Sequence, residues 1–315
     1  MTENSVDLII KNLKNLKIQG ASQVKRNSIL AARILAMQDK SPNLRQFEKN
    51  FKLKLKKIAF ARATEPQARE SLRQILLAER EACDLKEAKE NILEKCADLE
   101  KENVEAMKKI VEYGVSVLKK DSIVFTHCHS HTVENIFINA FEKGHLQKVI
   151  CTETRPRYQG RITAENLSKK GIPTIHIVDG AASTFMKEAD FFFTGADAIV
   201  ANASIVNKIG TSLISLKAKT ENVPHYVCAH SYCYDPETYH NFKEPIEQRD
   251  SNEVWDKKLK NLKILNPAFD VTEAEFIKGI ISEYGIFNPK KFCTKIAQVF
   301  GIKKGKYFPL KELLK

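Results

Sequence analysis

SIVFTHCHSHTVENIFINAFEKGHLQKVICTET, residues 122–154, decides the fold of this chain. Two short apolar runs, SIVFT and KVICTET, flank a segment with helical spacing, and the runs TIHIVDG, FFFTGAD and HYVCA follow further along. Apolar strands that alternate with helices at about 25 residues per unit are typical of a parallel sheet built from βαβ units. Because these runs are continuously apolar, the sheet should be covered on both faces. We therefore predict a Rossmann-like α/β fold with a mainly parallel sheet.

The residues before this stretch have a different pattern. In DLIIKNLKNL (7–16) apolar residues recur at helical spacing, and a long amphipathic segment extends over about residues 85–118. We therefore predict two domains, a helical N-terminal domain over residues 1–120 and a Rossmann-like α/β domain over residues 121–315.

The composition is that of an ordinary globular protein, with 315 residues, 43% of them hydrophobic and 29% charged. These values exclude a disordered or collagen-like chain. No apolar run is long enough to span a bilayer, and the N-terminal segment is too charged for a signal peptide. We therefore expect a cytoplasmic protein without a membrane partner, and its seven scattered cysteines fit reduced thiols.

The net charge is +12, which attracts anions such as phosphorylated metabolites, acidic proteins or nucleic acid. The sequence lacks the signatures of an RNA-recognition motif, a zinc finger or a helix-turn-helix. Because lysines on helices usually form a solvated face, we do not expect a nucleic-acid partner.

Polar side chains follow the ends of the predicted strands, where open parallel sheets bind their ligands. The residues at these positions are His127, Cys128, His129, Ser130, His131, Glu153, Arg155, Arg157, Asp179, Asp197, His230 and Cys233. A thiol, carboxyl groups, imidazoles and guanidinium groups together suit acid–base chemistry on an anionic substrate.

For three of the candidate residues the sequence permits either a functional role or an ordinary structural role. Cys128 lies between a strand and a helix, which predicts a lowered pKa for its thiol, although many small cysteines simply fill cores. Asp197 follows FFFTGA and could act at the rim or cap the next turn. Lys208, with Asn207 in a segment predicted as helical over about residues 205–219, could neutralise a phosphate or be an ordinary surface lysine.

The motifs THCHSHT, TETRPRYQGRITAENLSKKGIP, VDGAASTFMKEADFFFTGADAI, NKIGT and NPAFDVT closely resemble one superfamily. It contains ribose-1,5-bisphosphate isomerase, methylthioribose-1-phosphate isomerase and the regulatory subunits of initiation factor 2B. The resemblance covers most of the chain, is strongest over residues 126–229, and is closest to the archaeal-type ribose-1,5-bisphosphate isomerase. It implies a helical domain before a Rossmann-like catalytic domain, a cofactor-free aldose–ketose isomerisation, and a homo-oligomer built on a dimer, from a homodimer up to a hexamer.

The resemblance also implies roles for individual residues. The enzymes of the superfamily carry a cysteine and an aspartate that match Cys128, as a proton-transfer group, and Asp197, as its acid–base partner. The predicted substrate-binding residues are Gln19, Gly20, Ala21, Ser22, Arg62, Ser130, His131, Asn207 and Lys208. Ser130 and His131 are included because they lie on the rim, and the others because they resemble the family's substrate-binding positions.

At two positions where the family has a cationic side chain, this chain has an uncharged one. Gln19 stands where the family loop has arginine, and Cys233 stands where the enzymes have lysine. Each charge-assisted contact to a phosphate is typically worth about 1.5 to 3 kcal/mol, so one phosphate subsite could be weaker. Either other basic residues of the rim, among them Arg155 and Arg157, compensate, or the substrate is a different sugar phosphate.

The sequence leaves two alternatives to a metal-free isomerase: a zinc protein and a non-catalytic protein. Thiols and imidazoles are good zinc ligands, and they cluster at His127, Cys128, His129 and His131 and at Cys228, His230 and Cys233. Neither cluster has a standard zinc spacing, so we predict no metal and no cofactor. The second alternative is a non-catalytic regulatory subunit like those of initiation factor 2B, or a sensor of sugar phosphates or nucleotides. The presence of both Cys128 and Asp197 favours the enzyme.

Overall fold

The computed structural model describes residues 5–240, 243–302 and 307–315. Its first part is helical, as predicted, and consists of α1 (Ser5–Lys14), α2 (Ala21–Gln38), α3 (Leu44–Ala59), α4 (Pro66–Glu79) and α5 (Leu85–Val117). Asn43 and Asp84 cap α3 and α5, because their side chains accept hydrogen bonds from backbone N–H groups of the first turn. These helices enclose one apolar core, to which Phe47 and Leu72 contribute buried side chains.

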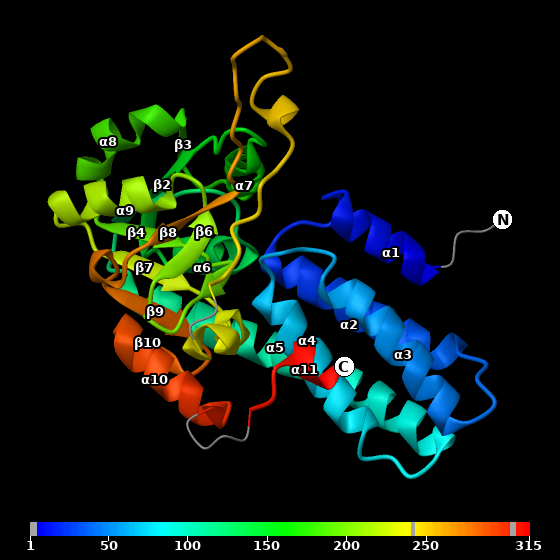
Figure 1. Cartoon of the computed structure of the whole chain (residues 1–315). Helices are drawn as coiled ribbons and strands as arrows, with labels where there is room; N and C mark the ends of the chain where they lie inside the picture. Colours follow the sequence, from blue (N-terminus) through cyan, green and yellow to red (C-terminus); the bar gives the residue numbers. More distant parts are fainter. Residues whose placement is uncertain (1–4, 241–242, 303–306) are drawn as a thin grey trace.

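The second part contains a seven-stranded sheet with the strand order β10-β9-β7-β4-β1-β2-β3 (Figure 1). Its strands are β1 (Ser122–Thr126), β2 (Leu146–Thr152), β3 (Thr174–Ile177), β4 (Phe191–Thr194), β7 (His225–Cys228), β9 (Gly279–Ser282) and β10 (Gly285–Phe287). All pairs are parallel except β9 with β10. This order confirms the prediction of a Rossmann-like fold with a mainly parallel sheet.

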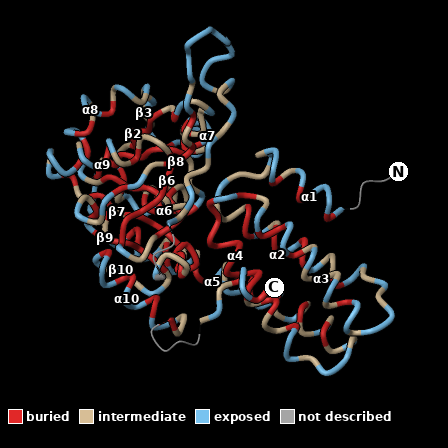
Figure 2. Tube along the Cα trace, viewed as in Figure 1, coloured by how far each residue is buried: buried red, intermediate tan, exposed pale blue. Residues whose placement is uncertain are grey.

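Helices cover both faces of this sheet, which explains its continuously apolar strands. They are α6 (His131–Glu142), α7 (Gln159–Lys169), α8 (Ala182–Phe185), α9 (Thr211–Thr220) and α10 (Pro289–Val299). Val124 packs in a core with residues of α5 and α6, whereas its neighbour Phe125 packs with residues of α8 and α9. Figure 2 shows the strands as buried tube between these two helical layers.

The long helix α5 joins the helical part to the sheet. Leu99 lies in the core of the helical part, whereas Ile110 and Val115, further along the same helix, pack in a core of the sheet. The last helix, α11 (Leu310–Leu313), returns to the helical part and packs against α4. The chain therefore crosses twice between the two parts, and the division into domains at residue 120 stays a prediction.

One local prediction was wrong. Residues Ile205–Lys208 form strand β6, not the start of a helix, and α9 begins only at Thr211. β6 pairs antiparallel with β5 (Ala198–Ile199) on one side and with β8 (Phe269–Thr272) on the other. β6 is thus the central strand of a small three-stranded sheet. Its backbone hydrogen bonds are made with β5 and β8 instead of within a helix.

Among the described residues, no helix is both long and apolar enough to cross a membrane. The cytoplasmic location stays a prediction.

Candidate active site

One pocket lies where the carboxyl ends of the parallel strands meet the helical part, and all the predicted site residues line it. They are Gln19, Gly20, Ala21, Ser22, Arg62, Cys128, Ser130, His131, Asp197, Asn207 and Lys208. They come from the start of α2, the connection between α3 and α4, the loop after β1, the loop after β4, and β6. Segments far apart in the sequence therefore converge on one cavity, as the strand-end rule predicted.

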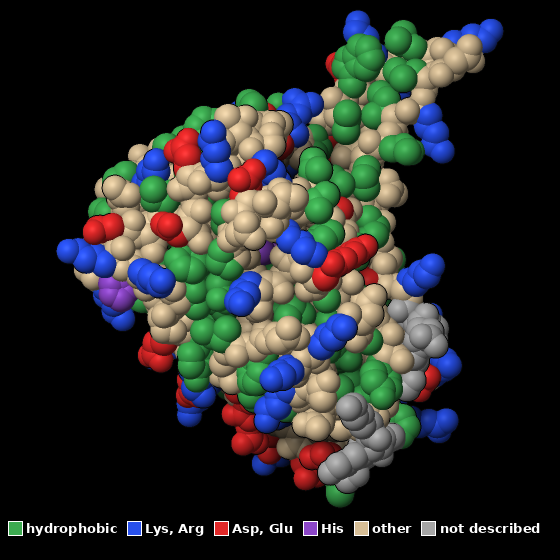
Figure 3. Space-filling model, turned by 90° about the vertical axis from the view of Figure 1, so that its left-hand side faces the viewer, with side chains coloured by type: hydrophobic (Ala, Val, Ile, Leu, Met, Phe, Trp, Pro, Cys, Tyr) green, Lys and Arg blue, Asp and Glu red, His purple; other side chains and the backbone are tan. Residues whose placement is uncertain are grey.

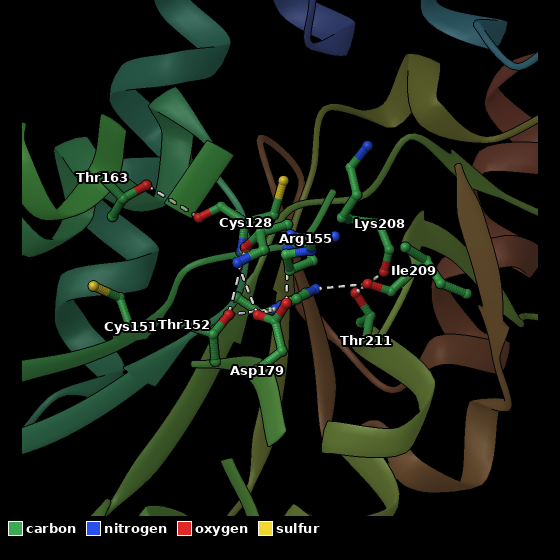
Figure 4. Close-up of polar contacts among 12 residues, drawn as sticks. Cys128, Cys151, Thr152, Arg155, Thr163, Asp179, Lys208, Ile209 and Thr211 are labelled. Carbon is green, nitrogen blue, oxygen red and sulfur yellow. Dashed lines mark hydrogen bonds and ion pairs between the residues drawn. The ribbon is translucent and has the colours of Figure 1, made fainter. Parts of the chain in front are cut away.

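Cys128 is held in an unusual backbone conformation at the bottom of this pocket. Its φ is 70°, in the left-handed region that few residues other than glycine adopt. Its N–H donates to Thr154 Oγ1 at 3.0 Å, and its carbonyl accepts from Thr163 Oγ1, also at 3.0 Å. In Figure 4 the Cys128 thiol and the Lys208 amine extend to the same side, away from these hydrogen bonds. Such strained residues cluster at functional sites, where the surroundings fix them.

A chain of hydrogen bonds ties the loop of Cys128 to the loop that follows Lys208. His127 Nε2 lies 2.9 Å from the carbonyl oxygen of Ile209, which only accepts, so Nε2 carries the proton. His127 Nδ1 then accepts from Thr152 Oγ1 at 2.6 Å. Because burial lowers the pKa of His127, the imidazole stays neutral and this arrangement holds at neutral pH. These hydrogen bonds connect the residue before Cys128 to the residue after Lys208.

The prediction of a lowered pKa for Cys128 was wrong. Burial raises the pKa of the thiol, and nearby Lys208 opposes this effect only in part. The helix that we expected to activate the thiol starts at His131, with Ser130 as its cap, so Cys128 lies outside its first turn. The thiol is therefore protonated at neutral pH, which suits a proton donor better than a nucleophile.

Asp197 and Lys208 line the same pocket, where Lys208 is buried and Asp197 is partly buried. Burial raises the pKa of Asp197, while the positive charges of Lys208, Arg62 and Arg249 oppose the shift. Lys208 is only 4% exposed, which excludes the alternative of an ordinary surface lysine. Burial lowers the pKa of Lys208, and Cys128 and Asp197 raise it again. The pocket therefore holds acids and bases whose proton affinities depend on each other.

Arg249 is a site residue that the sequence analysis missed. It lines the pocket, and its Nε donates to Glu247 Oε1 at 3.2 Å. It lies in an irregular segment without periodicity or motif, so nothing local indicated its position. The expected substitutes lie elsewhere: Arg155 bonds Tyr158, Arg157 pairs with Glu253, and neither lines the pocket. The prediction was therefore wrong for these two arginines, whereas the other basic candidates, His129, His131 and His230, do line the pocket.

The two positions where the family has cations carry an amide, Gln19, and a thiol, Cys233. Gln19 Nε2 donates to the carbonyl of Leu16 at 2.7 Å, and Gln19 Oε1 accepts from Gln159 Nε2 at 3.2 Å. Gln67 Nε2 donates to the Cys233 sulfur at 2.9 Å. The positive charge of the pocket thus comes from Arg62, Lys208 and Arg249, which line it.

Within the part of the chain that the structure describes, one group could hold a metal ion. His129, His131 and Glu134 offer ligand atoms that all lie within 4.8 Å of one another, at the start of α6. Neither Cys128 nor Cys233 belongs to this group, so the mixed thiol–imidazole clusters that we considered do not form there. The absence of a metal stays a prediction.

The fold and the pocket define an α/β protein with an acid–base site for an anionic ligand. A sequence model of the initiation factor 2 subunit family matches residues 17–289, and the chain belongs to this family. The resemblance that its motifs indicated is thereby confirmed.

Several relatives have names that state an activity. Ribose 1,5-bisphosphate isomerase of Thermococcus kodakarensis is 35% identical over 305 residues, which cover 93% of this chain and 94% of the relative. Methylthioribose-1-phosphate isomerase of Carboxydothermus hydrogenoformans is 37% identical over 216 residues, covering 64% of this chain and 63% of the relative. The solved structure of 5-methylthioribose 1-phosphate isomerase from Pyrococcus horikoshii superimposes with a TM-score of 0.79 at 28% identity, covering 93% of this chain and 88% of that one.

Proposed function

We propose that this protein is an aldose–ketose isomerase that converts ribose 1,5-bisphosphate to ribulose 1,5-bisphosphate. The observation that carries the proposal is the shared pocket of a buried thiol, Cys128, a partly buried carboxyl group, Asp197, and three cations. In sequence, relatives named ribose 1,5-bisphosphate isomerase align over 93% of this chain, whereas the methylthioribose-1-phosphate isomerase of Carboxydothermus hydrogenoformans aligns over 64% of it.

The reaction needs two proton transfers and no net change in oxidation level. A proton enters at the ring oxygen as the bond from that oxygen to C1 breaks, hydrogen moves from C2 to C1, and a proton leaves the C2 hydroxyl. C2 is oxidised to a ketone while C1 is reduced. Cys128, with its proton retained, supplies the first proton, and Asp197 accepts the second. A hydride shift needs only these two transfers, whereas an enediolate route also moves the C2 hydrogen to C1 as a proton.

The two phosphates need positive charge on opposite sides of the sugar. Arg62 has an Nη1 atom without a hydrogen-bond partner among the described residues, and Lys208 and Arg249 line the same cavity. Gly20, Ala21 and Ser22 bring the start of α2 to the pocket, where backbone N–H groups and the helix dipole favour an anion. These groups supply charge that Gln19 and Cys233 do not.

The proposal is tested by incubating the purified protein with ribose 1,5-bisphosphate and following the formation of ribulose 1,5-bisphosphate. Methylthioribose 1-phosphate and ribose 5-phosphate serve as competing substrates, and we expect the bisphosphate to give the highest kcat/KM. Turnover of methylthioribose 1-phosphate alone would move the assignment to that substrate. Tight binding of the bisphosphate without turnover would favour a sensor or a regulatory subunit.

Replacement of the buried cations should weaken binding more than turnover. Lys208→Met and Arg62→Gln each remove one charge-assisted phosphate contact, worth about 1.5 to 3 kcal/mol, so KM should rise about 10- to 100-fold. Steady-state kinetics check this, with Lys86→Met as the control because the Lys86 side chain is 84% exposed on α5. A fall in kcat at unchanged KM would contradict a binding role.

We also propose that the chain assembles into a homo-oligomer built on a dimer. Large apolar side chains are exposed on the sheet part and on its projecting loop: Val178, Leu213, Leu216, Trp255, Leu259, Leu262 and Leu265. Figure 3 shows exposed hydrophobic groups on this side of the molecule, with basic and acidic side chains interspersed between them. Burial of such groups favours association. Sedimentation velocity at micromolar concentration should give a dimer or larger, and a monomer would contradict the proposal.

A further inference from the structure

Glu65 is a buried carboxyl group of the pocket to which nothing above assigns a role. It directly precedes α4, lines the pocket beside Arg62, and is only 1% exposed. Its Oε1 lies 3.7 Å from Arg62 Nη2, and its Oε2 has no hydrogen-bond partner among the residues that the structure describes. Burying an unpaired carboxyl oxygen is costly, so a ligand is the natural partner for it.

The position of Glu65 also affects the charge of Arg62. Arg62 Nε donates to Glu247 Oε2 at 3.0 Å, so its guanidinium lies between two carboxyl groups. If both were ionised, they would more than cancel the positive charge that a phosphate needs. A proton on Glu65 leaves that charge available at Arg62 Nη1, which has no hydrogen-bond partner among the described residues.

Two carboxyl groups of one pocket, the buried Glu65 and the partly buried Asp197, compete for positive charge. Asp197 faces Lys208, Arg62 and Arg249. When two carboxyl groups share a desolvated site, the one with more cations nearby ionises first and the other keeps its proton. This asymmetry makes Asp197 the base and leaves Glu65 in the neutral form.

The surroundings of Glu65 favour that neutral form. The charged groups that act on it are Arg62, Arg69, Asp197 and Glu247. Arg69 is already engaged, since its Nη2 donates to both carboxyl oxygens of Glu244 at 3.1 and 3.0 Å. Burial, helped by the negative charges of Asp197 and Glu247, raises the pKa of Glu65 to about 8 against the opposing effect of Arg62.

We propose that Glu65 is a substrate-contacting acid whose carboxyl group stays protonated and donates a hydrogen bond to a sugar oxygen next to Arg62. In this role it leaves the charge of Arg62 free for the phosphate. The proposal rests on the proposed function, because it assigns Glu65 to the same pocket and the same phosphorylated sugar.

The pH profile of Glu65→Gln tests this role. Glutamine keeps the shape and a hydrogen-bond donor but cannot ionise. For the wild type we expect kcat/KM to fall above pH 8, by about tenfold at pH 9, because the ionised carboxyl then repels the bisphosphate. Glu65→Gln should lack that fall, so that its kcat/KM at pH 9 matches its own value at pH 7. An unchanged alkaline fall, or a loss of more than a hundredfold at every pH, would overturn the proposal.

Glu79→Gln is the matched control. Glu79 is the last residue of α4 and, like Glu65, is 1% exposed. Both of its carboxyl oxygens lack partners among the described residues, but it does not line the pocket. Its pKa is raised by burial to about 7, so a general effect of ionising a buried acid would appear here too. We expect the Glu79→Gln profile to match the wild type, and a lost alkaline fall in this variant would refute the assignment to Glu65.

A binding experiment separates this inference from the proposed function. If the wild type does not isomerise the bisphosphate, the proposed function fails. Calorimetric titration with ribulose 1,5-bisphosphate at pH 7 and pH 9 then still tests Glu65. Weaker binding at pH 9 in the wild type, but not in Glu65→Gln, supports the inference. The same pH dependence in both proteins, or no binding at all, overturns it.

Discussion

Replacement of Cys128 by serine is expected to lower kcat on the order of 10²- to 10⁴-fold while KM changes little. The thiol is buried, retains its proton at neutral pH, and shares its pocket with Asp197 and Lys208. A hydroxyl in the same place is a much weaker acid, so the ring oxygen loses its proton donor mainly in the transition state. Steady-state kinetics on ribose 1,5-bisphosphate at neutral pH measure the effect.

The Cys151→Ser variant is the control for this experiment. Cys151 is also buried, burial raises the pKa of its thiol to about 12, and it lies on β2 outside the pocket (Figure 4). It should retain wild-type kcat. Near-full turnover of a well-folded Cys128→Ser protein would show that Cys128 is not the proton donor.

Those parts of the fold that depend on a repeated local pattern could be predicted. The strands of the main sheet are continuous apolar runs, because both faces of the sheet are buried, and this pattern is visible without a structure. The rule that ligands bind at the carboxyl ends of parallel strands then placed Cys128 and Asp197 together before any contact was known. Gln19 and Arg62 were predicted from the family motifs alone. They do not follow a strand, so the strand-end rule does not apply to them.

The errors concern features that tertiary contacts determine. Residues Ile205–Lys208 form a strand only because β5 and β8, distant in sequence, pair with them. Arg249 reaches the pocket from an irregular segment, held by Glu247. No local pattern in the sequence encodes either contact.

The wrong pKa direction for Cys128 has the same origin. We predicted that a helix starts directly after Cys128 and that its first turn lowers the pKa of the thiol. The helix, α6, begins three residues later, at His131. The extent of burial, which dominates the shift, depends on the whole pocket and not on neighbours in the sequence. Glu65 is a similar case, since its burial follows from the packing of α4 and not from the residues beside it.

Replacement of Asp197 by asparagine should lower kcat by a similar factor, about 10²- to 10⁴-fold, because the amide cannot accept the proton of the C2 hydroxyl. The wild-type base must be ionised. Since burial raises the pKa of Asp197, wild-type activity should rise with pH through a value above that of an ordinary aspartate. The residual activity of the variant should not show this rise with pH.

Stability provides a second readout for Asp197→Asn. A carboxyl group whose pKa is raised on folding stabilises the fold while it is protonated, and this contribution is lost as pH rises through the folded pKa. At neutral pH the variant should therefore unfold at the same temperature as the wild type or a higher one, although it has lost turnover. Asp190→Asn is the control, because Asp190 lies at the other end of β4, outside the pocket, where it accepts the N–H of Ile123 at 2.8 Å. That variant should keep its turnover, and an Asp197→Asn protein with near-wild-type kcat would exclude Asp197 as the base.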